Sequence, residues 1–301
     1  MVTATAHRSV ELTSRERSGA AVRWAVLAFA SSATLVGVYW AAVRTHTGQQ
    51  VENAALRGSY QVNADEVTDA DLALASITLT SLGVAVVILA VIGWVRGGVR
   101  LAAVAVGVIV GATLTTEILK RILLSRPDLA GGPSQWLHNS FPSGHTTVAM
   151  AVACATLLVV SWRWRTIAML VVTGWTVGVG AYTVIARWHR LSDTLGADAI
   201  ALTTTSLGAL VLLHSGLVRR VPDQRFAPVR TLLLTVAALY VLGVGLLGAY
   251  VGRAGIGQGP GTSIAEWNLY LAAQSLASVG SVLTVLLAWW SWRRLETVRP
   301  E

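Results

Sequence analysis

Long apolar runs separated by short polar segments dominate the chain. The runs cover about residues 21–43, 73–95, 101–119, 145–161, 166–186, 194–214, 231–251 and 267–291. Several approach or exceed the roughly 18–20 apolar residues that a helix needs to cross a bilayer. Only helices and closed barrels satisfy the backbone in lipid, and these runs are too long and continuous for barrel strands. The pattern therefore predicts an all-α, polytopic transmembrane helix bundle of about eight spans.

Composition supports lipid as the main solvent of the chain. Apolar residues make up 54% and charged residues 13% of the sequence, whereas soluble domains carry about 25% charged residues. The first apolar run is too long for a cleaved signal peptide and is interpreted as a retained span. We expect residues 1–20, which are polar and mixed in charge, to form a disordered cytoplasmic tail. The single cysteine, Cys154, lies in an apolar run and is predicted to be a core residue.

Arginine placement predicts the orientation. With the N-terminus inside, every inside segment is basic, while the outside loop 44–72 is acidic on balance. The positive-inside rule then places both termini in the cytoplasm and makes the chain a multi-pass cell membrane protein. The inside basic residues are Arg8, Arg15, Arg17, Arg23, Arg96, Arg100, Arg163, Arg165, Arg219, Arg220, Arg225, Arg230, Arg293, Arg294 and Arg299.

Two outside segments break this charge pattern. Segment 120–142 holds Lys120, Arg121 and Arg126, and segment 187–193 holds Arg187 and Arg190. Basic residues on the outer face oppose the topology signal, and anion binding supplies a reason for them. The net charge of +8 otherwise serves to orient the spans. Because no basic run is interleaved with aromatic residues, we predict no nucleic-acid partner.

Basic residues in these segments suit phosphate. Lys120, the only lysine of the chain, and Arg126 offer positive charge and donors to phosphate oxygens. The run Pro142-Ser143-Gly144-His145 precedes an apolar run and predicts a turn into a helix, whose free N–H groups bind anions. Snorkelling of the basic side chains and an ordinary helix start are the alternatives when each feature is taken alone.

Two histidines and an aspartate complete the candidate chemistry. His189 and Asp193 are four residues apart, so on a helix the carboxylate can hold and polarise the imidazole. That pair is the orienting half of a triad and suits a histidine nucleophile. His145 is a second imidazole, able to protonate a leaving group. The predicted topology brings all these residues to one membrane face.

These segments resemble the signature of the type 2 phosphatidic acid phosphatase (PAP2) family, in the acid phosphatase and vanadium haloperoxidase superfamily. The family pattern is K-x6-R-P, then P-S-G-H, then S-R-x5-H-x3-D, and the similarity covers roughly residues 70–215. Here five residues, not six, separate Lys120 from Arg126. Tyr182 and Thr183 occupy the Ser-Arg positions of the third motif, so the usual arginine is missing and Arg187 or Arg190 is expected to replace it.

The resemblance implies a role for each matching residue. His189 would attack phosphorus and form a phosphohistidine, Asp193 would orient it, and His145 would protonate the leaving oxygen. The phosphoryl oxygens would be held by Lys120, Arg126, Ser143 and the Gly144 N–H. The resemblance implies no metal or cofactor, and the sequence lacks a carboxylate cluster that suggests a metal site.

Remaining features complete the predicted organisation. Glu117 and Asp198 are candidates for supporting the site, because intramembrane carboxylates are costly and often functional. We expect a six-span PAP2-like catalytic core over 21–214, a basic cytoplasmic loop over 215–230, and two additional C-terminal spans with a tail over 231–301.

The functional hypothesis is hydrolysis of a lipid phosphate at the outer membrane face. The substrate would be an isoprenoid diphosphate, phosphatidic acid or phosphatidylglycerol phosphate, with Trp136 and Trp188 near the head group. A phosphotransferase that uses the same phosphohistidine is one alternative. A transporter or lipid-binding membrane protein with a degenerate site is another, although no broken helices or duplicated halves are evident in the sequence.

Overall fold

The computed structural model describes residues 10–131, 133, 136–221, 227–259 and 261–299. Residues 1–9 of the predicted tail and 222–226 of the predicted basic loop lie outside the described residues. The helices are α1 (Ser14–Val38), α2 (His46–Gly58), α3 (Ala64–Ala75), α4 (Leu79–Ile118), α5 (Gly144–Val159), α6 (Trp162–Ile185), α7 (Leu191–His214), α8 (Ala227–Gly257) and α9 (Ser263–Ser291), with short helical turns η1 (Tyr39–Val43), η2 (Ser59–Gln61) and η3 (Leu119–Leu123) and strands β1 (Val218–Arg220) and β2 (Leu295–Thr297).

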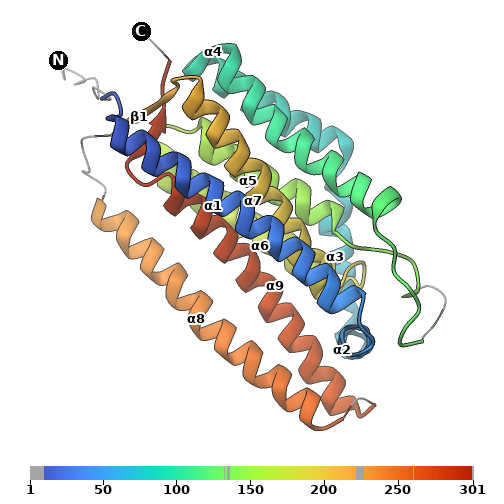
Figure 1. The fold of residues 1–301 in the computed structure, drawn as a ribbon. Coiled ribbons are helices and arrows are strands. Elements are labelled where there is room, and N and C mark those ends of the chain that lie inside the picture. The colour runs from blue at the N-terminus through green and yellow to red at the C-terminus, as the bar shows by residue number, and fades with distance from the viewer. Residues whose placement is uncertain (1–9, 132, 134–135, 222–226, 260, 300–301) are drawn as a thin grey trace.

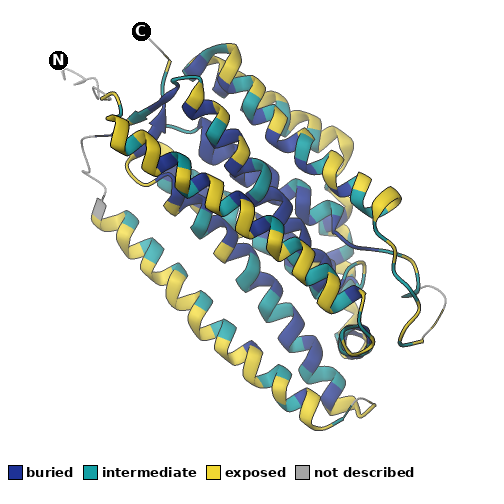
Figure 2. Ribbon diagram, in the orientation of Figure 1, coloured by how far each residue is buried: buried dark blue, intermediate teal, exposed yellow. Residues whose placement is uncertain are grey.

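The long helices form one elongated bundle, with α5 and α7 at its centre (Figure 1). Every residue of α5 from Ala149 to Val159 is buried, while α1, α4 and α8 expose apolar faces (Figure 2). Small residues such as Ala151, Ala153 and Ala155 allow the neighbouring helices to approach α5 closely. An apolar exterior around a packed core is what a lipid solvent permits.

Six helices in the described part of the chain are long and apolar enough to cross a membrane. The prediction of an all-α, polytopic membrane bundle is thereby confirmed. α5 is apolar but shorter, at 16 residues. α4 contains most of both predicted spans 73–95 and 101–119, whereas Ala73–Ala75 form the end of α3.

α4 reverses direction at Gly98, whose φ is +73°. A methyl group added to Gly93 would lie 3.0 Å from the Cα atom of Ala102, whereas nine residues of straight helix span about 13.5 Å. The two halves therefore run side by side (Figure 1). The reversal needs a positive φ, which glycine adopts without steric cost.

The end of the bundle that carries both termini is closed by short contacts. α1 begins at Ser14, earlier than the predicted span, because Thr13 and Glu16 form a capping box. This helix takes in the last part of the predicted disordered tail. β1 pairs antiparallel with β2, so a small sheet that the sequence did not predict joins the basic loop to the C-terminal segment.

At the opposite end, α2 lies across the tips of the spanning helices (Figure 1). Its buried residues include Gln49, Glu52 and Asn53, a polar stripe at helical spacing. α9 packs against α2, α6 and α7, whereas α8 packs mainly against α9. The predicted outer loop 44–72 is thus largely helical and partly inserted between the core and the C-terminal helices.

Candidate functional site

The three predicted segments meet at the α2 end of the bundle. The Ser143 N–H donates to the Asp193 backbone carbonyl at 2.9 Å. Asn139 Nδ2 donates to the carbonyl oxygens of Lys120 and Leu124, both at 3.1 Å. These contacts join residues that are far apart in the sequence. They show that the end of η3 lies beside the starts of α5 and α7.

A cavity of about 610 Å³ lies where the segments meet. This volume is in the range of small-molecule sites. The walls combine polar and charged side chains with the apolar Leu56, Ile77, Leu79, Leu82 and Val148. The predicted site residues that line the cavity are Glu117, Lys120, Gly144, His145, Arg187, His189 and Arg190, joined by Trp136, His138, Ser140 and Trp188.

His189 and Asp193 form the predicted pair. The Nδ1 atom of His189 lies 3.1 Å from Asp193 Oδ2, and the carboxylate is fully buried. The same oxygen accepts the Arg190 N–H at 2.9 Å, while the His189 N–H donates to the Thr183 carbonyl at 3.1 Å. Asp193 therefore holds the imidazole at Nδ1, while the bond to Thr183 fixes the backbone of His189, and the Nε2 atom remains for chemistry in the cavity.

The second imidazole and the start of α5 form another part of the cavity wall. His145 is the second residue of α5, and its ring packs edge-on against Trp188 with centroids 5.2 Å apart. A methyl group placed on Gly144 would lie 4.0 Å from Lys120 Nζ and 3.9 Å from Glu117 Oε1. An ammonium group beside free N–H groups of a helix start is a suitable site for an anion.

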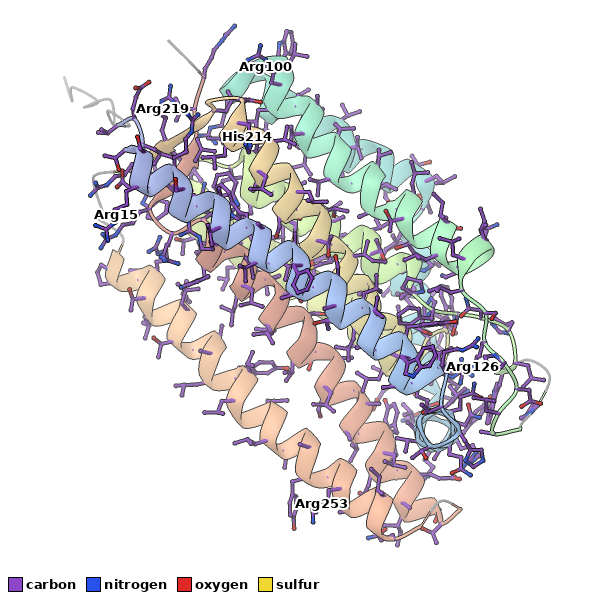
Figure 3. All side chains as sticks on the ribbon, in the orientation of Figure 1. Arg15, Arg100, Arg126, His214, Arg219 and Arg253 are labelled. Carbon is purple, nitrogen blue, oxygen red and sulfur yellow. The ribbon has the colours of Figure 1, made fainter. Side chains whose placement is uncertain are left out.

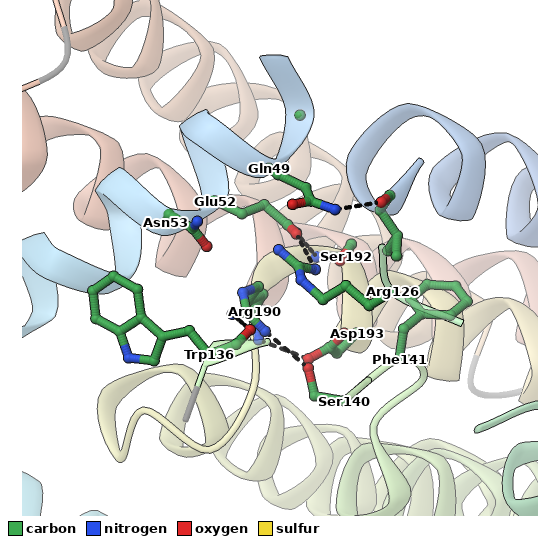
Figure 4. A network of polar contacts seen from close by, with 12 residues as sticks. Gln49, Glu52, Asn53, Arg126, Trp136, Ser140, Phe141, Arg190, Ser192 and Asp193 are labelled. Atoms are coloured by element: carbon green, nitrogen blue, oxygen red, sulfur yellow. Dashed lines mark hydrogen bonds and ion pairs between the residues drawn. The ribbon is translucent and has the colours of Figure 1, made fainter. Parts of the chain in front are cut away.

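Two predicted phosphate ligands do not line this cavity. Arg126 is buried, with 3% of its side chain exposed, and its Nη1 lies 3.5 Å from Glu52 Oε2 (Figure 4). Ser143 is fully buried and caps α5 by accepting the Thr146 N–H at 3.3 Å. Both side chains therefore bind other groups of the protein, whereas the sequence predicted that they would bind phosphate together with Lys120.

A buried polar network surrounds Arg126. Glu52 Oε1 accepts the Ser192 N–H at 3.1 Å, at the first turn of α7. Arg190 donates to Ser140 Oγ at 3.1 Å and to the Trp136 carbonyl at 2.9 Å (Figure 4). The network therefore links α2, the loop before α5 and the start of α7.

Burial shapes the electrostatics of this network. It raises the pKa of Glu52 above its ordinary value, and the nearby Asp193 charge adds to the effect, outweighing the Ser192 N–H and the Arg126 and Arg190 charges. Burial likewise lowers the pKa of Arg190, with Arg126 as a second cause. Both shifts follow from removing charge from water.

The structure places both candidate replacements for the missing arginine on the cavity wall. Arg187 has a φ of +64°, donates to the Ser59 carbonyl at 3.3 Å and lies over the Tyr60 ring at 4.1 Å. Arg190 faces the loop before α5. Thr183, at the position of the missing arginine, is buried and bonds to the Gly180 carbonyl.

The two candidate supporting carboxylates lie apart. Glu117 lines the cavity and pairs with Arg121, whose side chain is largely exposed. Asp198 is buried between α7 and α9, where it accepts the Ser281 hydroxyl at 3.0 Å. Asp198 is not among the cavity-lining residues, so it joins the C-terminal helices to the core instead.

Glu52 is the main residue that sequence reasoning missed. In the sequence, Glu52 is one of several acidic residues of the outside loop 44–72. A signal was present, since Gln49, Glu52 and Asn53 have the spacing of one helix face. Their burial depends on where α2 lies, which no local pattern specifies.

The site lies at the opposite end from most arginines. Arg15, Arg100 and Arg219 lie at one end of the bundle and Arg126 at the other (Figure 3). Within the described residues, no group of three or more His, Cys, Asp or Glu side chains is arranged to hold a metal ion.

Comparison with known proteins identifies the family. No curated protein and no solved structure matches the chain. The family model of the PAP2 superfamily matches residues 74–216. That segment contains η3 and the starts of α5 and α7, and hence the cavity residues from Ile77 to Arg190. The match confirms the expected resemblance to the PAP2 family over residues 74–216.

Proposed function

We propose that this protein is an integral membrane phosphatase that hydrolyses a lipid phosphate or isoprenoid diphosphate through a phosphohistidine. The observation that carries the proposal is the His189–Asp193 pair, at 3.1 Å, on the wall of a cavity that also holds His145 and Lys120. A held nucleophile, a second imidazole and a fixed cation are the parts that phosphoryl transfer requires.

In the first step His189 Nε2 forms a bond to phosphorus while the bond from phosphorus to the leaving oxygen breaks. His145 donates a proton to that oxygen, and the lipid alcohol, or the shorter phosphate ester, departs. Asp193 accepts the Nδ1–H of His189 and offsets the positive charge that the imidazole gains.

In the second step water attacks the phosphohistidine. His145, now neutral, takes a proton from the water as its oxygen bonds to phosphorus and the P–N bond breaks. Inorganic phosphate leaves, and His189 returns to its starting state. Lys120 and the first N–H groups of α5 offset the charge on the phosphoryl oxygens in both steps. The proposal requires no metal ion.

A lipid substrate is supported by the surroundings of the cavity. The apolar side chains of Ile77, Leu79 and Leu82 line it together with the charged groups, and Leu79 is 89% exposed on α4. A lipid could approach from the bilayer and bring its phosphate to the charged wall. Trp136 and Trp188 are suited to the interfacial level.

An outward-facing site is supported by the charge distribution. The end of the bundle with Arg15, Arg100 and Arg219 is the basic end (Figure 3). The positive-inside rule assigns that end to the cytoplasm, and therefore the cavity to the non-cytoplasmic side.

The test is phosphate release by the full chain, purified in detergent, from a panel of lipid phosphates and diphosphates in the presence of a chelator. The wild type should release phosphate, and the His189→Ala variant should lose at least about a thousandfold of the rate. His145→Ala should lose about a hundredfold or more. A His214→Ala variant, changed at the opposite end of the bundle (Figure 3), is the matched control.

Equal release by wild type and both active-site variants would refute the mechanism. Loss of activity with the chelator would refute metal independence. Transfer of phosphate to an added alcohol in preference to water would instead identify a phosphotransferase.

A further inference from the structure

A second cavity adjoins the candidate active site on its other side. It has a volume of about 390 Å³ and lies among α2, α8 and α9. Its walls are mainly apolar, with Ala55 of α2, Ala249 and Ile256 of α8, and Ala273 and Leu276 of α9. Two of the helices that line it, α8 and α9, lie outside the segment that matches the PAP2 superfamily, whereas Val184 of α6 and Leu191 of α7 lie within it.

The two cavities share residues. Leu56, His189 and Arg190 line both of them. An apolar space therefore meets the charged site at the proposed nucleophile. This continuity separates the cavity from an ordinary groove between membrane helices, such as the one along Leu234 and Leu242 on α8, which contacts no site residue.

Small side chains create this space. On α8, Gly248 and Gly252 face α9, and a methyl group on Gly252 would lie 3.1 Å from the Cβ atom of Ala272. The neighbouring Ala249 and Ala273 have small side chains, which leave part of the space among α2, α8 and α9 unfilled. Ala249 and Ile256 are exposed on the lipid side of α8, so the cavity borders the bilayer.

We infer that the cavity among α2, α8 and α9 binds the hydrocarbon chain of the phosphate-bearing lipid. The inference rests on the proposed function and specifies where the apolar part of the substrate lies. It gives α8 and α9 a role in selecting substrates with a long chain. The rival location is the wall of the first cavity formed by Leu79 and Leu82 on α4.

The experiment compares a lipid probe with a chain-free probe on the purified full chain. The lipid probes are dioleoyl phosphatidic acid and farnesyl diphosphate, and the chain-free probe is p-nitrophenyl phosphate. We expect Ala249→Phe, which fills the cavity, to lower the ratio of kcat/KM for lipid over chain-free probe by about tenfold. Ala55→Phe should do the same from the α2 side.

Ala238→Phe is the matched control, because Ala238 is also an exposed alanine on α8 but lies about three turns away. It should leave the ratio unchanged. An unchanged ratio in both cavity variants, or an equal loss for both kinds of probe, would overturn the inference.

Photocrosslinking provides a second measurement that does not depend on the variants. A phosphatidic acid with a diazirine at the end of its chain should label peptides of α8 or α9, and the label should be stronger than that from phosphatidylcholine with the same chain. Labelling of α4 instead, or equal labelling by both lipids, would overturn the inference. If no probe releases phosphate, the proposed function itself fails, which distinguishes the two failures.

Discussion

Two groups of charged side chains lie at the same end of the bundle and differ in what they contact. The open group, Lys120, Arg187 and His189, lines the larger cavity. The closed group, Glu52, Arg126 and the guanidinium of Arg190, is bonded to protein atoms of α2, α7 and the loop before α5 (Figure 4). A basic residue in a signature motif can therefore stabilise the fold instead of binding substrate, because a buried charge requires a partner whether or not substrate is present.

The largest expected effect comes from breaking the closed group. Glu52→Ala removes the acceptor of both Arg126 and the Ser192 N–H, leaving buried donors without a partner. We expect a loss of about 3 kcal/mol in the free energy of unfolding, measured as a lower thermal midpoint in detergent. Glu66→Ala, on the exposed side of α3, is the control. Equal midpoints for wild type and Glu52→Ala would show that the network adds no stability.

Removing a charge from the open group should lower the catalytic rate and leave the thermal midpoint nearly unchanged. Lys120→Ala is expected to lower kcat/KM by about a hundredfold, since one donor to the phosphoryl oxygens is lost. The thermal midpoint should change little, because the Lys120 side chain has no ion pair among the described residues. Steady-state phosphate release and a thermal scan measure the two quantities. A large fall in midpoint would place Lys120 in the scaffold.

The two candidate arginines provide a direct comparison between the groups. Arg187→Ala should raise the KM and weaken inhibition by orthovanadate by about tenfold, as a charged donor on the cavity wall is lost. Arg190→Ala should mainly lower the thermal midpoint, because its guanidinium binds Ser140 and the Trp136 carbonyl. If instead Arg190→Ala raises the KM and weakens vanadate inhibition while Arg187→Ala lowers the thermal midpoint, Arg190 replaces the missing motif arginine.

The smallest expected effect is a pH dependence from Glu52. Its folded-state pKa is raised above the unfolded value of about 4.3. Such a group contributes stability that is fully present below the unfolded pKa and is lost as pH rises through the folded pKa. The midpoint of the wild type relative to Glu52→Gln should therefore fall as pH rises from about 4 towards neutrality.

Thermal scans of both proteins across this pH range measure the difference, in which other titrating groups cancel. Arg126 and Arg190 face Glu52 and favour its charged form, while Asp193 opposes it. If the midpoint of the wild type relative to Glu52→Gln rises with pH, the charges of Arg126 and Arg190 affect the Glu52 carboxylate more strongly than its burial does.

The membrane bundle can be predicted from the sequence, since apolar runs as long as a bilayer core is thick are compatible with few other structures. The sequence also identified His145, His189 and Asp193, whose grouping follows from placing three helix ends on one face. His189 and Asp193 were predicted to meet because a four-residue spacing is a local property of a helix turn.

Which charged side chains face the cavity depends on the packing of the helices and could not be predicted from the sequence. Arg126 lies against Glu52, and Asp198 against Ser281, because α2 packs on α9 and α9 packs on α7. The reversal at Gly98 and the pairing of β1 with β2 likewise depend on contacts between segments distant in the chain. Hydrophobic pattern specifies which residues leave water, whereas the partner of each buried polar group depends on how the helices pack together.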